Sequence, residues 1–478
     1  MDPPRWLLVF LFRPLRLLIA FVVLAFVSIQ LAMRYGQHNP NSNFFDPTLE
    51  TFQNPISDAR TTEARNWIEQ MDLRLQEGNV PVQRFKSASG IASGPELAVV
   101  FLTVRRPHEQ YLDASIGSFL MDIPNLQRPK IHVSVSSGEL DPTNQPFFSS
   151  AWLHGLVDQI VVRKEPKEPY LPATMASRKD QPHAALTVMQ KPLVNLANKN
   201  SRTNDWQRAG TSDYSIAMEI CEKTNGRYCL IVEDDVVFKK GWYNIFEQSL
   251  RKAEERTHAK GTQQWAYLRL FYAEKYFGWE NEEVQKLVLC CSLIVGSVAI
   301  FILVFGRVPA RYATIAGVRS KMDLMRAHEG LDHDERKIGR GGMARARLPF
   351  ASQLLILLMT LFYCVLFILS GRNLIYKVPE GVSLMNTRGC CTQATLYPNE
   401  VVRPLKDHIR QNIGLMPYHN LINRWLDAHD KDRLAISPPL VQHVGAGSPK
   451  ALLEESYVRS TPLWSFAFEQ QQQKVSNV

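Results

Sequence analysis

Three consecutive carboxylates, Glu233, Asp234 and Asp235, follow directly on the apolar run Tyr228–Val232 and precede the apolar Val236–Phe238. Carboxylates that crowd together and are partly buried favour protonation unless a cation neutralises them. A divalent metal is the simplest such cation, and it could also neutralise a diphosphate leaving group. An acidic turn or a helix N-terminus is the alternative, because acidic residues are favoured there as well.

Two further segments carry groups that suit the same chemistry. His443 lies between a short apolar strand and a glycine-rich loop, where a neutral imidazole could complete a metal site. A hydrogen-bonded core histidine is the alternative. Thr103, Arg105 and Arg106 end another apolar run, and arginines at such a place suit a diphosphate or a uracil edge, unless they are ordinary surface charge.

The elements that must position these groups alternate between strands and helices. A continuous apolar run predicts a strand over Leu97–Val104, alternation predicts a second over Lys130–Val135, and a third is predicted over Val157–Val162. The segment Ser212–Lys223 is predicted to be a helix. This alternation indicates an α/β fold with a mostly parallel sheet and helices on both faces. Ligands bind beyond the carboxyl ends of such strands, so we expect the arginines and the acidic triplet to line one crevice.

Three charge-free stretches are long enough to span a bilayer: Leu17–Met33, Leu287–Phe305 and Leu348–Ser370. A cleaved signal peptide is the alternative for the first, but small residues do not form a cleavage site there. Buried core helices are the alternative for the other two. Because these two bracket a strongly basic loop, we expect membrane spans.

The net charge of +9 is concentrated in that loop, where ten Lys and Arg residues stand against five acids between Gly306 and Phe350. This placement indicates membrane topology and membrane lipids as partners, and it argues against nucleic-acid binding. Under the positive-inside rule the N-terminus and the loop face the cytosol. Arg34–Lys286 and Gly371–Val478 would then lie together on the lumenal side.

Four cysteines fall outside the expected spans: Cys221, Cys229, Cys390 and Cys391. An oxidising lumen favours one or two disulfides among them, with the vicinal pair taking separate partners, and four thiols allow three pairings. Zinc is the other use of four cysteines, but no CxxC motif is present.

Several of these segments together resemble a known family. Tyr228–Phe238, Ser212-Asp213-Tyr214 and Pro439–Gly445 followed by Ser448 are similar to the metal-dependent GT-A glycosyltransferases related to N-acetylglucosaminyltransferase IV. More specifically, a GT-A domain interrupted by a transmembrane hairpin after Trp265–Phe271 resembles the Golgi GPI N-acetylgalactosaminyltransferase family.

The resemblance implies transfer of N-acetylgalactosamine from UDP-N-acetylgalactosamine to a mannose of the GPI glycan, with inversion, in the Golgi lumen. GPI or GPI-anchored proteins would be the acceptor, and Mn²⁺ or another divalent cation the cofactor. In this chain it implies Asp235 and His443 as metal ligands, with Glu233 as a further candidate ligand. Glu233 and Asp234 would order the ribose or the metal's surroundings. The residues expected to face the nucleotide and donor sugar are Thr103, Arg105, Arg106, Asp213 and Tyr214.

Inversion requires a general base, and here the sequence departs from the family pattern. Where related enzymes place a carboxylate, this chain reads Pro417-Tyr418-His419. His419 and Glu400 are the main candidate bases and Asp427 and Asp430 are weaker ones, with helix capping or surface polarity as the alternative for each. Two other functions stay open: an N-acetylglucosaminyltransferase acting on N-glycans, and an inactive lumenal glycan-binding protein.

These inferences divide the chain into nine segments. They are a cytosolic N-terminus (1–14), a first span (15–33), a lumenal stem (34–95), a first GT-A segment for donor and metal (96–286), a second span (287–305), a cytosolic basic loop (306–347), a third span (348–370), a second GT-A segment for the acceptor (371–460) and a C-terminal tail (461–478).

Overall fold

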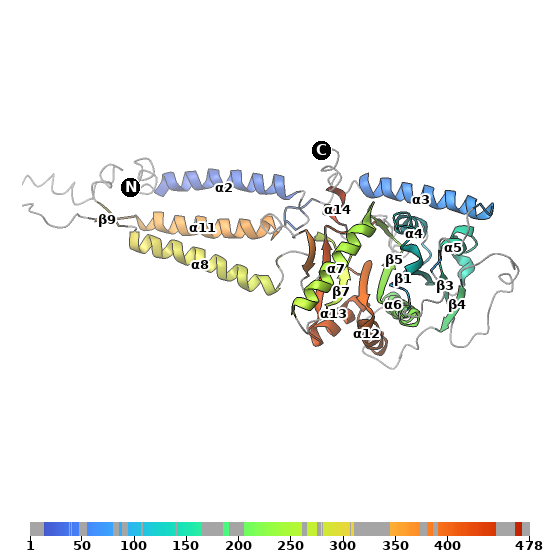
Figure 1. Ribbon diagram of the computed structural model, residues 1–478. Helices are drawn as coiled ribbons and strands as arrows, with labels where there is room; N and C mark the ends of the chain where they lie inside the picture. Colours follow the sequence, from blue (N-terminus) through green and yellow to red (C-terminus); the bar gives the residue numbers. More distant parts are fainter. Residues whose placement is uncertain are drawn as a thin grey trace, which may run out of the picture. The chain divides into compact units, whose positions relative to one another are not determined.

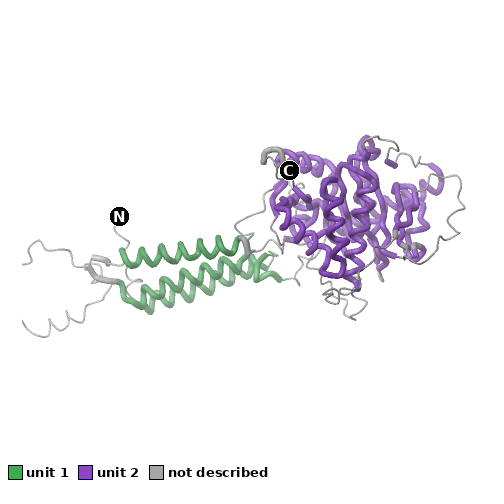
Figure 2. The backbone as a smooth tube through the Cα atoms, turned by 90° about the horizontal axis from the view of Figure 1, so that it is seen from below, with its two compact units in different colours: residues 1–49, 278–377 green, residues 50–277, 378–478 purple. Residues whose placement is uncertain are grey.

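The chain forms two compact units in the computed structural model, one of residues 1–49 and 278–377 and the other of residues 50–277 and 378–478 (Figure 2). Each unit therefore combines segments that are far apart in sequence. The structure describes residues 14–37, 39, 41–46, 55–79, 86–87, 94–106, 109–139, 141–164, 185–190, 205–260, 265–274, 279, 281–305, 307–309, 345–372, 380–385, 391–445 and 464–470.

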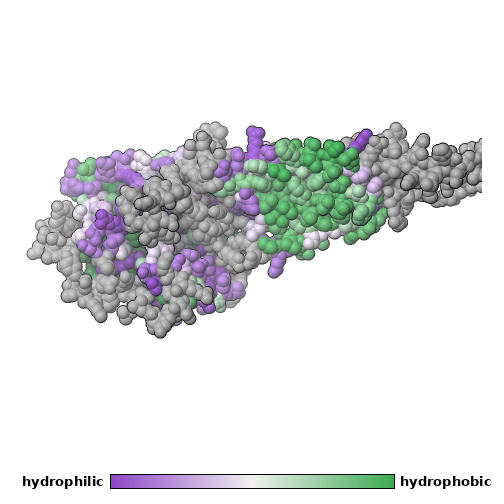
Figure 3. Space-filling view, turned by 180° about the vertical axis from the view of Figure 1, so that it is seen from behind, coloured by the Kyte–Doolittle hydropathy of each residue, from purple (hydrophilic) through white to green (hydrophobic). Residues whose placement is uncertain are grey.

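The first unit contains three long helices, α2 (Pro14–Gly36), α8 (Asn281–Phe305) and α11 (Phe350–Ser370). All three are long and apolar enough to cross a membrane. Their apolar side chains form a continuous surface on this unit (Figure 3). Three candidate spans were predicted from the sequence and are confirmed. Most of the basic loop expected between the second and third, residues 310–344, lies outside the described residues.

Polar contacts join these helices to one another. The Ser28 hydroxyl of α2 lies 3.2 Å from the Tyr363 hydroxyl of α11. Near the end of α11, Arg372 forms an ion pair of 2.8 Å with Glu283 of α8. A short antiparallel pair, β8 (Arg307–Pro309) and β9 (Arg345–Arg347), follows α8 and precedes α11.

The second unit is built on one nine-stranded sheet, many of whose strands are labelled in Figure 1. Its strands, in spatial order, are β10 (Gly381–Leu384), β12 (Asp432–Ser437), β7 (Trp265–Arg269), β11 (Ala394–Pro398), β5 (Tyr228–Glu233), β1 (Leu97–Thr103), β2 (Ile131–Ser137), β3 (Gln159–Lys164) and β4 (Ala185–Gln190). Strands β5, β1, β2, β3 and β4 pair in parallel, and β12 is parallel to β7. The predicted mixed α/β fold with a mostly parallel sheet is confirmed.

The α/β unit consists of a first chain segment, residues 50–277, and a second chain segment, residues 378–478. The centre of its sheet contains a strand from the second segment. β11 pairs antiparallel with β5 on one side and with β7 on the other. A further two-stranded sheet pairs β6 (Val236–Phe238), which follows the acidic triplet, with β13 (Val441–His443). The segments on either side of residues 278–377 therefore fold together as one unit.

Helices cover both faces of the sheet, because its strands are apolar on both sides. One buried cluster includes residues of α3 (Pro55–Gln76), α4 (Leu112–Leu120), α5 (Ala151–Leu156) and α7 (Trp242–Lys260). The other includes residues of α6 (Asp205–Thr224), α12 (Asn399–Gln411) and α13 (Tyr418–Ala428). A last short helix is α14 (Phe466–Gln470).

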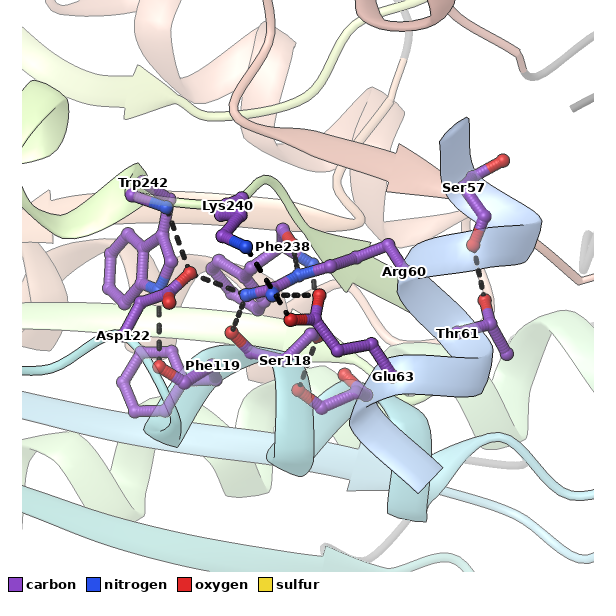
Figure 4. A network of polar contacts seen from close by, with 12 residues as sticks. Ser57, Arg60, Thr61, Glu63, Ser118, Phe119, Asp122, Phe238, Lys240 and Trp242 are labelled. Atoms are coloured by element: carbon purple, nitrogen blue, oxygen red, sulfur yellow. Dashed lines mark hydrogen bonds and ion pairs between the residues drawn. The ribbon is translucent and has the colours of Figure 1, made fainter. Parts of the chain in front are cut away.

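α3, in the expected stem range, is attached to this unit by a buried arginine (Figure 4). Arg60 donates hydrogen bonds to the carbonyl oxygens of Phe238 (2.8 Å) and Ser118 (3.2 Å). It also pairs with Asp122 at 2.5 Å and with Glu63 at 2.8 Å. Because Phe238 ends β6, this contact fixes α3 to the strand that follows the acidic triplet.

One disulfide is present among the described residues, between Cys221 at the end of α6 and Cys229 in β5. A disulfide was predicted, but the expectation that Cys390 and Cys391 take these two as separate partners is wrong. Spacing alone could not show that the turn between α6 and β5 brings Cys221 and Cys229 together. Cys390 lies outside the described residues.

Candidate active site

The acidic triplet lies at the carboxyl end of β5, next to the end of β1. Leu102 of β1 pairs with Glu233, the last residue of β5, so Thr103 lies directly beside the triplet. On the other side, β13 pairs with β6 so that His443 is opposite Val236. Two strand pairings therefore bring together residues that lie more than 300 positions apart.

Asp234 is directed towards the end of β1. Its carboxylate accepts a hydrogen bond of 2.7 Å from the Thr103 hydroxyl and one of 2.6 Å from Arg106. The Val104 amide adds a longer contact of 3.4 Å. Asp234 is 2 % exposed, so its charge depends on these donors.

Asp235 is the meeting point of the two chain segments. Its Oδ2 atom lies 2.9 Å from Arg106 and 3.1 Å from Nε2 of His443, and all three side chains are buried. Its backbone oxygen accepts from the Val444 amide at 2.9 Å. Gly445 packs so closely that a Cβ atom there would lie 2.6 Å from Asp235 Oδ2. Any side chain at position 445 would therefore force Asp235 or the loop after β13 to shift.

The electrostatics of these groups follow from burial and from their neighbours. Burial raises the pKa of Asp234, against the opposing charge of Arg106. Burial alone would also raise the pKa of Asp235, but His443 and Arg106 together hold it well below its usual value. Burial opposes protonation of His443, yet Asp235 raises its pKa above the ordinary value. The site is thus built around an ionised Asp235.

Glu233 is held by residues from the second chain segment. The Tyr418 hydroxyl donates to its carboxylate at 2.9 Å, and the Thr392 hydroxyl does so at 3.2 Å. Its backbone amide donates to the Gln393 carbonyl oxygen at 2.8 Å. Burial, followed by repulsion from Asp235, raises the pKa of Glu233 to about 7.

Behind Tyr418 lie two buried tyrosines. Its ring stacks on Tyr214 at a centroid separation of 4.6 Å, and the Tyr214 hydroxyl lies 2.7 Å from that of Tyr397. Tyr214, expected to face the donor, is therefore packed beneath the acidic triplet. Asp213, expected beside it, forms an ion pair with Arg163 at the end of β3.

The remaining expected site residues lie in different places. The Arg105 side chain is exposed, and the Arg105 backbone amide donates to Glu139 at 3.2 Å. His419 is exposed in the first turn of α13, next to Tyr418.

The structure does not bring Glu400 to this site. β11 runs antiparallel to β5 and ends with Pro398 opposite Tyr228, the first residue of β5. Glu400 comes two residues after Pro398 and therefore lies near the amino end of β5, whereas Glu233 is at its carboxyl end, roughly 16 Å away by strand rise. The Glu400 side chain is exposed.

Three residues of the site were not expected from the sequence: Thr392, Tyr418 and Gly445. Gly445 belongs to a glycine-rich loop directly after His443, and that spacing was the available signal for it. For Thr392 and Tyr418 no local signal exists, because their contact with Glu233 depends on the central position of β11 and on α13.

An α/β unit with an acidic triplet at the carboxyl end of β5 fits an enzyme that binds its ligand beyond the carboxyl ends of parallel strands. The family model described as GPI-N-acetylgalactosamine transferase PGAP4 matches residues 173–442, which is more than half of the chain. The chain belongs to this family and is a glycosyltransferase with a role in GPI N-acetylgalactosamine transfer. The match ends directly before His443 and begins after Thr103 and Arg106. No curated protein matches the chain.

Proposed function

We propose that this protein transfers N-acetylgalactosamine from UDP-N-acetylgalactosamine to a mannose of the GPI glycan, with inversion, through a metal-dependent GT-A site. The observation that carries this proposal is the buried Asp235–His443 contact, made by two chain segments and flanked by Arg106. It supports a single site for the donor diphosphate. The family match supports the sugar and the acceptor.

The residues present fit a divalent cation that substrate helps to hold. Within the described residues of the chain, Oδ1 of Asp235 and Nδ1 of His443 are buried and have no hydrogen-bond partner. In the same residues, no group of three His, Cys, Asp or Glu side chains is placed to hold a metal. A carboxylate and an imidazole leave positions that the oxygens of a diphosphate would fill, as is usual for cations bound with nucleotides. Bound there, Mn²⁺ would neutralise the charge of the leaving diphosphate.

The protein's own groups then have distinct roles. Asp235 and His443 would hold the cation, and Thr103 and Arg106 would keep Asp234 ionised and oriented. Arg106 would also be available to a phosphate oxygen once a cation takes over Asp235, because its guanidinium presents several donors.

The acceptor would approach from the second chain segment. Thr392 and Tyr418 come from this segment and reach Glu233, which supports an acceptor site beside α13. Of the two main candidate bases, His419 follows Tyr418, which contacts Glu233, whereas Glu400 lies near the amino end of β5. An imidazole can accept the proton of an attacking hydroxyl. We therefore propose His419 rather than Glu400.

The three apolar helices support a membrane-bound enzyme. We propose that α8 and α11 form a hairpin across the Golgi membrane, with the N-terminus and the basic loop cytosolic and the α/β unit lumenal. Because a GPI acceptor is itself a lipid, anchoring by three spans would raise its effective concentration at the site.

The test uses full-length protein in nanodiscs containing a GPI acceptor. Transfer is measured from UDP-N-acetylgalactosamine and UDP-N-acetylglucosamine, after chelation and after Mn²⁺ is restored. We expect transfer of N-acetylgalactosamine only, dependent on metal, and reduced roughly 100-fold or more in Asp235→Asn and His443→Ala. Glu400→Gln is the control and should retain activity. Metal-independent transfer by the wild type, or full activity of Asp235→Asn, would refute the metal site.

A further inference from the structure

Residues Trp464–Glu469, near the C-terminus, pack into the α/β unit, and we name them the C-terminal clamp. Trp464, Ser465 and Phe468 are buried, Ser465 completely. The clamp comprises the start of α14 and the two residues before it. A short segment this deeply buried must replace water at the polar groups that it covers.

The first of these groups is the side-chain amide of Gln442 in β13, which is also fully buried. Its nitrogen donates to the Ser465 carbonyl oxygen at 2.9 Å, and its oxygen accepts from the Ser465 amide at 2.9 Å. The nitrogen also donates to Glu469 at 3.1 Å. The Gln442 side chain thus forms the same pair of hydrogen bonds with the Ser465 backbone that a residue of a neighbouring strand would form.

Gln442 and His443 are neighbours on one strand, so their side chains point to opposite faces. Gln442 contacts the clamp, and His443 contacts Asp235 on the other face. β13 has only three residues and pairs with one strand, β6. The clamp therefore supports the face of β13 opposite the proposed metal site.

The clamp is itself fixed by a second buried carboxylate. Glu274, five residues after β7, accepts from the Ser465 hydroxyl at 2.7 Å, the Phe466 amide at 2.9 Å and the Ala467 amide at 3.0 Å. These amides open the first turn of α14, where a negative charge is favoured. Clamp and carboxylate thus satisfy each other's buried polar groups.

A third attachment leads to the start of α3. The Glu469 carboxylate accepts from the backbone amides of Ile56 (3.0 Å) and Ser57 (3.3 Å) while it also accepts from Gln442. One side chain thus ties β13 to the beginning of α3. Three separate regions of the unit, β13, the segment after β7 and α3, converge on six residues.

We propose that the C-terminal clamp is a positioning element of the transferase, which acts through Gln442 to hold His443 opposite Asp235. The proposal rests on the metal site proposed above. It makes Gln442 a positioning residue, since its own side chain faces away from Asp235. Residues that orient a metal ligand typically change metal affinity or activity by about 10–100-fold when they are replaced.

The first test compares Gln442→Met with Gln159→Met, the same substitution at a glutamine of β3. Gln159 also forms hydrogen bonds through both amide atoms, with Thr187 at 2.7 Å and Ser134 at 3.2 Å. It is the first residue of β3, which is separated from β5 by β1 and β2. In full-length protein we expect Gln442→Met to raise the Mn²⁺ concentration for half-maximal transfer about tenfold. Gln159→Met should leave it unchanged. An equal effect of both variants would mean a general loss of stability and would overturn the proposal.

The second test does not depend on metal or activity. Hydrogen–deuterium exchange of metal-free, full-length protein should show the amides of Val441–Val444 exchanging about tenfold faster in Gln442→Met than in wild type. A chain that ends at residue 470 should match the wild type, and one that ends at residue 463 should match Gln442→Met. Unchanged exchange in Gln442→Met would refute the clamp, whereas metal-independent transfer by the wild type would refute only the metal site.

Discussion

The Tyr418 hydroxyl donates a hydrogen bond of 2.9 Å to the carboxylate of Glu233, although 185 residues separate them. This contact joins the first turn of α13 to the end of β5, and with it the two chain segments. Through this hydrogen bond, α13, beside which we propose the acceptor site, contacts the acidic triplet directly.

Among the described residues, removal of this hydroxyl in Tyr418→Phe should leave Glu233 with Thr392 as its remaining side-chain donor. We expect a loss of about 1–3 kcal/mol in the free energy of unfolding, as for a buried hydrogen bond to a charged group. We also expect kcat for transfer to fall on the order of tenfold. Tyr397→Phe is the matched control, because it removes a hydroxyl that bonds Tyr214 and not Glu233. Equal kcat values for the two variants would contradict a role of Tyr418 at the triplet.

Arg106 compensates two buried carboxylates at once, Asp234 and Asp235. In Arg106→Met both carboxylates lose the guanidinium, although Asp235 keeps its contact with His443. This loss should lower the free energy of unfolding by about 3–5 kcal/mol. Mn²⁺ should restore some of this loss, because the metal would supply positive charge at the same place. Thermal unfolding with and without Mn²⁺ measures both effects. A metal-induced stabilisation no larger than in the wild type would count against metal binding at Asp235.

Gly445 leaves no room for a side chain beside Asp235. In Gly445→Ala the new Cβ would meet Asp235 Oδ2 at 2.6 Å, so the carboxylate or the loop must shift. We expect a stability loss of about 1–3 kcal/mol, typical of overpacking, and a weaker response of transfer to Mn²⁺. Gly296→Ala, in α8, is the control, because among the described residues no atom beyond its chain neighbours and the adjacent helix backbone lies within 4 Å of its added Cβ. Unchanged metal activation in Gly445→Ala would show that Asp235 tolerates displacement.

The Cys221–Cys229 disulfide closes a short loop between α6 and β5. Replacement of both cysteines by alanine should destabilise the unit by about 2–3 kcal/mol, from the entropy of a loop of this length in the unfolded chain. Denaturant unfolding of the variant and of the wild type, with and without a reductant, measures this difference. The reductant should destabilise only the wild type, and an equal effect on the variant would point to another disulfide.

The sequence predicts β1, β2, β3 and β5 of the parallel part of the sheet, because their apolar or alternating patterns are local. It does not predict β4, the outermost parallel strand. It does not predict β11, a five-residue strand that ends in Pro398 and pairs with strands from the other chain segment. The misplacement of Glu400 follows from this omission, since the antiparallel direction of β11 carries it to the amino end of β5.

The candidate site shows the same division. Glu233, Asp234, Asp235 and His443 were predicted to form a metal site from their residue types and sequence context, and the structure places Asp235 beside His443. The contacts of Arg106 with the triplet depend on the pairing of β1 with β5, and those of Tyr418 depend on helix packing. Such long-range geometry leaves no periodic pattern in the sequence.

The central position of β11 also constrains how the protein can be made. During synthesis β5 and β7 leave the ribosome first, but the strand that belongs between them begins at residue 394, 125 residues after β7 ends at residue 269. At about 5–20 residues per second, the sheet stays open for on the order of ten seconds. During this interval the unpaired edges of β5 and β7 are exposed to other chains, so folding of the α/β unit must wait until α8 and α11 have been synthesised.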